Sequence, residues 1–131
     1  MKIDHIAIWT QQLENLKEFY IAYFRGEAGA MYHNKKKNFL SYFLSFGDGA
    51  RLEIMSAPGI PNNQNDTISS QHQGIIHIAF ELPSRKNVDE KADELQKAGI
   101  RILDGPRVTG DGYYEFVTLD PDNNRLEVTA K

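Results

Sequence analysis

The feature of this sequence that most constrains its fold is an internal repeat. Residues 5–7 read His-Ile-Ala, and the same three residues return at 77–79. Residues 51–53 read Arg-Leu-Glu, and they return at 125–127. Each half of the chain therefore opens with His-Ile-Ala and closes with Arg-Leu-Glu. Self-similarity at a nearly constant offset predicts two copies of one supersecondary unit.

Hydrophobic periodicity predicts the same order of elements in both copies: a strand, a helix and three further strands. The apolar spacing predicts helices over about 12–25 and 86–98, with Gly26 and Gly99 as their stops. The expected strands are 3–9, a weaker one near 27–33, 38–46 and 50–55 in the first copy, and 74–82, 100–103, 113–119 and 125–129 in the second. The expected fold class is α+β, built from two tandem βαβββ modules.

The length of 131 residues allows one domain, which we place at 1–131. Module one is expected at about 2–57 and module two at about 74–130. Between them, about 58–73 is rich in Pro, Asn, Ser and Gln, which predicts a linker or surface loop.

Composition excludes several classes of protein. The formal net charge is −3 and the pI is near 5.8, so neither nucleic acid nor an anionic membrane is expected as a partner. The chain has no cysteine, which excludes disulfides, thiolate nucleophiles and iron–sulfur clusters. Mean hydropathy is −0.51, and no apolar run is long enough to span a membrane. A cytoplasmic location is the expectation.

Two histidines are expected to lie on strand faces opposite the apolar residues. Side chains alternate along a strand, so the first strand groups Asp4 with Ile6 and Ile8 and turns His5 to the other face. In the strand at 74–82 the alternation likewise separates His77 from its apolar neighbours.

Two glutamates follow the same rule in the closing strands. Glu53 lies opposite the face of its apolar neighbours, and Glu127 does the same in the last strand. Two histidines and two glutamates suit zinc, nickel, cobalt, manganese or iron(II), with open positions for water or a substrate. A cross-strand polar network without a metal is the alternative.

Several motifs together resemble one known family. These are His-Ile-Ala-Ile at 5–8, Arg-Leu-Glu at 51–53, His-Ile-Ala-Phe at 77–80 and Phe-Val-Thr-Leu-Asp-Pro-Asp-Asn-Asn-Arg-Leu-Glu at 116–127. The chain resembles the vicinal oxygen chelate superfamily over about residues 2–130. This superfamily includes glyoxalase I, methylmalonyl-CoA epimerase, extradiol dioxygenases and bleomycin resistance proteins. The resemblance implies that the two modules form a cupped mixed sheet.

The resemblance to glyoxalase I also implies site residues. His5, Glu53, His77 and Glu127 match its four metal-ligand places, with zinc or nickel as the usual metal. Glu127 matches the catalytic base, with Glu53 as the second candidate. The implied activity is that of a lyase or isomerase that abstracts a proton next to a carbonyl, with a metal-stabilised enediolate. Glutathione or another thiol is the implied co-substrate.

Residues 105–112 resemble the glycine-rich loop that covers the substrate in this family. Arg107 would bind a substrate carboxylate there, and a surface hairpin loop is the alternative. A homodimer is expected, in which the ligands come from one chain or from two. The alternative functions are an epimerase of the same superfamily and a non-catalytic protein that binds a small molecule.

Overall fold

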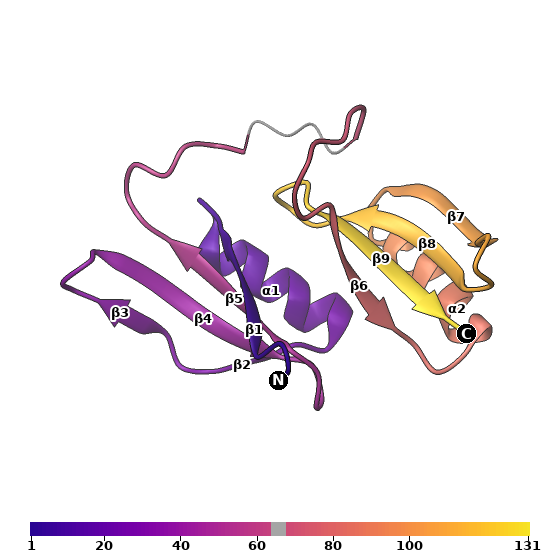
Figure 1. The fold of residues 1–131 in the computed structure, drawn as a ribbon, viewed down its shortest axis with the longest axis horizontal. Coiled ribbons are helices and arrows are strands. Elements are labelled where there is room, and N and C mark those ends of the chain that lie inside the picture. Colours follow the sequence, from indigo (N-terminus) through magenta and orange to yellow (C-terminus); the bar gives the residue numbers. More distant parts are fainter. Residues whose placement is uncertain (64–67) are drawn as a thin grey trace. The chain divides into compact units, whose positions relative to one another are not determined.

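Figure 1 shows the computed structural model, which describes residues 1–63 and 68–131. The chain divides into two compact units, Met1–Asn63 and Gln64–Lys131. The first holds the elements expected of module one and the second those of module two, so the expected α+β class and the βαβββ order are confirmed. The expected linker at 58–73 has neither helix nor strand in its described part, and residues 64–67 lie outside the described residues.

Module one is a mixed sheet with one helix against it. Its elements are β1 (His5–Trp9), α1 (Leu13–Phe24), β2 (Glu27–Ala28), β3 (Tyr32–Asn34), β4 (Phe39–Ser45) and β5 (Arg51–Ser56). The strand order is β1-β5-β4-β2, and β3 also pairs with β4. β1 runs parallel to β5, whereas β4 runs antiparallel to it. The core of this module contains Leu16 and Tyr20 from the helix and Leu44 and Ile54 from the sheet, all fully buried.

Two details of module one differ from the expectation. The weak strand near 27–33 is two short strands, β2 and β3, which pair with different parts of β4. The left-handed residue that ends α1 is Arg25, with φ of 55°, rather than Gly26. Gly26 has another role: a Cβ there would lie 3.1 Å from the ring of Phe46, which is a tight contact. The glycine allows close packing and does not make the turn.

Module two repeats the plan. Its elements are β6 (His77–Glu81), α2 (Arg85–Lys97), β7 (Ile102–Val108), β8 (Tyr114–Leu119) and β9 (Arg125–Ala130), in the sheet order β6-β9-β8-β7. The Ser84 side chain caps α2 by accepting a hydrogen bond from the backbone N–H of Asn87. The core of this module includes Val88 and Leu95 from the helix and Phe116 from the sheet, all fully buried.

The strand register is the same in both modules. In module one His5 pairs with Arg51, and Glu53 lies opposite Ala7. In module two His77 pairs with Arg125, and Glu127 lies opposite Ala79. The histidine of each first strand and the glutamate of each last strand are therefore diagonal neighbours on one face. The repeat in the sequence is a repeat in strand pairing.

The turn before β9 is held by a buried aspartate. Asp120, which is 4% exposed, accepts hydrogen bonds from the backbone N–H groups of Asp122 and Asn124 and from the Asn124 side chain. Asn123 adopts the left-handed conformation that the Asp-Pro-Asp-Asn turn predicts, with φ of 63°. This turn fixes the start of β9 and thereby the position of Glu127 in that strand.

Within the described residues, no helix has the length and apolar character needed to cross a membrane.

Candidate metal-binding site

In module one the predicted histidine and glutamate face each other. The Nε2 of His5 lies 3.8 Å from an Oε of Glu53. The Glu53 side chain is largely buried and that of His5 is more open. Both belong to the sheet face opposite α1, because their strand neighbours Leu52 and Ile54 are buried on the helix side. The pair presents one nitrogen and one carboxylate to a ligand on that face.

Asp4 fixes which nitrogen of His5 is presented. Its Oδ2 lies 2.9 Å from the Nδ1 of His5 and 2.5 Å from a guanidinium nitrogen of Arg51. These two contacts, first His5 and then Arg51, lower the pKa of the Asp4 carboxyl below its ordinary value. An ionised Asp4 favours the proton on Nδ1 and leaves the lone pair on Nε2, facing Glu53. This arrangement of carboxylate, histidine and open nitrogen fits a metal ligand.

The expected alternation is wrong at Asp4. The sequence groups this residue with Ile6 and Ile8, but β1 begins at His5, so Asp4 precedes the strand and its carboxylate turns toward the histidine. Strand alternation holds only where both neighbours are in the strand. Asp4 is thus a site residue that the sequence reading misses.

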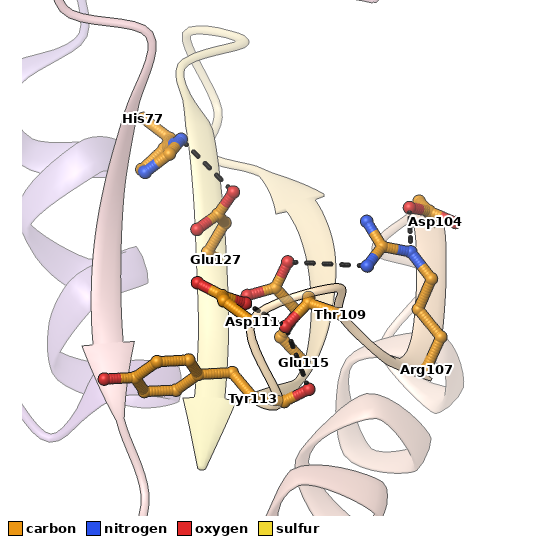
Figure 2. A network of polar contacts seen from close by, with 8 residues as sticks. All are labelled: His77, Asp104, Arg107, Thr109, Asp111, Tyr113, Glu115 and Glu127. Carbon is orange, nitrogen blue, oxygen red and sulfur yellow. Dashed lines mark hydrogen bonds and ion pairs between the residues drawn. The ribbon is translucent and has the colours of Figure 1, made fainter. Parts of the chain in front are cut away.

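In module two His77 and Glu127 form the corresponding pair, drawn in Figure 2. The Nδ1 of His77 lies 3.2 Å from an Oε of Glu127. The contacting nitrogen differs from that of His5, whose Nδ1 contacts Asp4; the residue before His77 is Ile76, which offers no such carboxylate. Both side chains are partly exposed on the face opposite α2.

A second set of charges shares the sheet of module two. Arg107 lies opposite Glu115 in the pairing of β7 with β8. Its Nε donates to Asp104 over 2.6 Å, and its Nη1 lies 3.7 Å from Glu115 (Figure 2). Burial, and next the charge of Glu127, raise the pKa of the Glu115 carboxyl, while Arg107 opposes that shift. Glu115 is a third carboxylate beside the His77–Glu127 pair.

The sequence prediction of a loop over 105–112 is wrong in its first half. β7 extends to Val108, and only residues 109–113 connect it to β8. The Thr109 hydroxyl closes this connection by donating to Asp111, and its oxygen also lies 3.1 Å from the backbone oxygen of Tyr113 (Figure 2). Arg107 therefore projects from a strand. Its proposed contact with a substrate carboxylate stays a prediction.

The structure brings the four predicted ligands together as two pairs, one in each module. Among the described residues, no group of three or more His, Asp or Glu side chains has an arrangement that would hold a metal ion. Glu115 and Asp104 are the further polar residues that sequence reading missed. A signal for Glu115 was present, because alternation along 113–119 separates it from the buried Phe116.

The fold and the pairs define a class: two βαβββ modules, each with a histidine in its first strand and a glutamate in its last. The sequence model of the Glyoxalase/Bleomycin resistance protein/Dioxygenase superfamily matches residues 2–128. The chain belongs to this superfamily, and its fold is the vicinal oxygen chelate fold.

Individual relatives agree with this assignment. The chain is 35% identical to the uncharacterized protein YqjT of Bacillus subtilis (strain 168), with 98% of each chain covered. A glyoxalase family protein from Enterococcus faecalis superposes with a TM-score of 0.77 at 26% identity, covering 98% of this chain and 96% of that one. The trypanothione-dependent glyoxalase I of Leishmania major superposes with a TM-score of 0.78 at 17% identity, covering 99% and 86%, and this likeness concerns the fold alone.

Proposed function

We propose that this protein is a divalent-metal-dependent lyase or isomerase resembling glyoxalase I. The observation that carries the proposal is the repeated pair: His5 with Glu53 and His77 with Glu127, at the same strand register in both modules. Four ligands of this kind suit zinc or nickel, and also cobalt, manganese or iron(II). When bound, such an ion supplies Lewis acidity that polarises a carbonyl oxygen.

The chain's own residues supply the rest of the proposed chemistry. Glu127 is partly exposed on its sheet face, so it can reach a substrate that lies there. We assign it the removal of a proton from the carbon next to the carbonyl, with Glu53 as the second candidate. Asp4 orients His5 and does not touch the substrate. The proposed substrate is a small molecule, formed with glutathione or another thiol.

The proposed assembly is a homodimer, in which the two pairs come from one chain or from two. Sedimentation at micromolar concentration gives the mass in solution. A monomer that retained activity would require all four ligands to come from one chain.

Metal content is the direct test of the site. Tag-free protein is stripped with a chelator, re-equilibrated with zinc, nickel, cobalt, manganese and iron(II), and analysed for bound elements. About one ion per four-ligand set is expected, with loss of that ion in His77→Ala and in His5→Ala. Absence of a bound ion in the parent protein would mean that the pairs form only a polar network.

Activity is then assayed with the preferred ion. The hemithioacetal of methylglyoxal and a thiol is supplied, and thioester formation is followed by its ultraviolet absorbance. Turnover supports the lyase proposal. Saturable binding of the same adduct without turnover under any of the five metals would replace it with a binding function.

A further inference from the structure

Glu115 is a desolvated carboxylate that accepts no hydrogen bond from any described residue. Its side chain is 13% exposed, and its one ion-pair contact, the Nη1 of Arg107 at 3.7 Å, is longer than a hydrogen bond. A carboxylate in this situation has lost much of its hydration and has little to replace it. Such a group is stabilised by a ligand that brings a hydrogen-bond donor or a positive charge.

Glu115 lies on the same sheet face as Glu127, the proposed base. It lies opposite Thr129, two residues along β9 from Glu127, so the two glutamates are diagonal neighbours on one face. Figure 2 shows the carboxylate of Glu115 between the carboxylate of Glu127 and the guanidinium of Arg107. A substrate that is held beside Glu127 and extends over β8 would meet Glu115.

The charge around Glu115 favours a cation. Arg107 and His77 are the basic side chains in the network of Figure 2, and Asp104 already binds the Nε of Arg107. Asp111 and Glu127 add negative charge near Glu115. Because its charge is already compensated, Arg107 attracts a substrate carboxylate weakly.

Module one lacks this feature. The residue that corresponds to Glu115 is Ser41, which lies opposite Met55 as Glu115 lies opposite Thr129. Ser41 is fully buried and carries no charge. The repeat therefore conserves the His–Glu pair in both modules and places the extra carboxylate in module two alone.

We propose that Glu115 is a specificity-determining residue that binds a protonated amine on the substrate or on its thiol. This inference rests on the proposed function and names its substrate class: a cationic thiol adduct is preferred over an anionic one.

The test uses three thiols that differ mainly in charge. They are 2-(dimethylamino)ethanethiol, which is cationic, 2-mercaptoethanol, which is neutral, and 3-mercaptopropionate, which is anionic. The tertiary amine avoids the ring closure that a primary aminothiol undergoes with an aldehyde. Their methylglyoxal adducts are assayed for turnover by the metal-loaded protein. Binding of the three S-methyl thioethers is measured separately by NMR titration, which does not depend on turnover.

The wild-type protein should bind the cationic thioether about tenfold more tightly than the anionic one, a difference of about 1.4 kcal/mol. Glu115→Gln, which preserves the shape of the side chain, should reduce that ratio to about twofold. Glu90→Gln is the matched control, because Glu90 is an exposed glutamate of α2, the helix that packs against the other face of the sheet. It should leave the ratio near its wild-type value, and circular dichroism checks that both variants fold.

The outcomes separate the two proposals. Equal or stronger binding of the anionic thioether by the wild-type protein overturns the role of Glu115. So does an equal loss of the ratio in Glu90→Gln and Glu115→Gln, because an equal loss would reflect only the change in net charge. If the cationic preference holds but none of the adducts turns over, Glu115 keeps its role and the lyase proposal fails. If the anionic adduct turns over best, the lyase proposal stands and this inference fails.

Discussion

The Oδ2 of Asp4 lies 2.9 Å from the Nδ1 of His5, whereas Ile76 stands before His77 at the corresponding place in module two. The two histidines are thus held differently. His5 has a carboxylate on one nitrogen and Glu53 near the other. His77 contacts Glu127 through Nδ1. Because carboxylate partners of this kind fix the tautomer and orientation of a metal-ligating histidine, Asp4 has a specific role in the proposed site.

Replacing Asp4 by alanine should weaken metal binding about tenfold or more, since the carboxylate that orients His5 is lost. The measurement is a competition between the protein and a chelator of known affinity. Asp4→Asn is the matched control, because an amide oxygen still accepts from Nδ1–H. Equal metal affinity in Asp4→Ala and the wild type would remove the orienting role.

Replacing Glu127 by glutamine should reduce kcat by about 10²–10⁴-fold and leave most metal binding intact, because the amide oxygen still ligates but accepts no proton. The comparison is with Glu53→Gln, which is assayed with the same adduct and the same ion. A rate for Glu127→Gln equal to the parent rate would make the base assignment wrong. A much larger loss in Glu53→Gln would transfer that role to Glu53.

Replacing Glu115 by glutamine should stabilise the protein near pH 7. The pKa of the Glu115 carboxyl is raised by burial and by the charge of Glu127, so the folded chain holds this proton more tightly than the unfolded chain does. Ionised Glu115 therefore lowers the free energy of unfolding at neutral pH. This destabilisation disappears as the pH falls below 4.5, the ordinary pKa of a glutamate carboxyl, because the carboxyl is then protonated in both states.

Urea unfolding near pH 7 and near pH 4 measures this effect. We expect the free energy of unfolding of Glu115→Gln to be higher than that of the wild type by a few tenths to about 1 kcal/mol near pH 7. Near pH 4 the two values should be equal. Destabilisation by this substitution near pH 7 would show that the contact with Arg107 outweighs the cost of burial. Residues that serve binding often lower the stability of the fold, so their replacement by an uncharged residue is expected to stabilise the protein.

Replacing Asp120 by alanine should cost about 2–3 kcal/mol of unfolding free energy, because a buried carboxylate and three hydrogen bonds of the turn before β9 are lost. Asp48→Ala is the control, since Asp48 is an exposed residue in the hairpin turn before β5. Its expected effect is within about 0.5 kcal/mol. Denaturant unfolding compares the two, and similar costs would contradict the structural role of Asp120.

Much of the site follows from local pattern. The repeat of His-Ile-Ala and Arg-Leu-Glu, together with side-chain alternation, predicts that His5, Glu53, His77 and Glu127 lie opposite the helix faces of their sheets. The burial of Leu52 and Leu126 beside the two glutamates agrees with this. The helices are within one or two residues of their predicted bounds, because their apolar spacing is regular.

Other features depend on neighbours that are distant in sequence. Glu115 belongs to the site because β8 pairs with β9 and with β7, and this pairing brings Arg107 opposite it. Gly26 permits the ring of Phe46 to pack closely, which a helix-stop signal does not reveal. Residues 105–108 look like a loop by composition, yet they form part of β7 because β8 lies beside them.

The sequence by itself determined the two-module plan, the elements of each module and the faces of the four candidate ligands. These properties depend on periods of two and 3.6 residues, which are local. Only the tertiary structure decided the contacts: that Asp4 turns from its expected face to the Nδ1 of His5, and that Glu115 lies near Glu127 without a hydrogen-bond donor among the described residues. Such contacts depend on where a strand begins and which strand lies beside it, and those follow from the packing of the whole module.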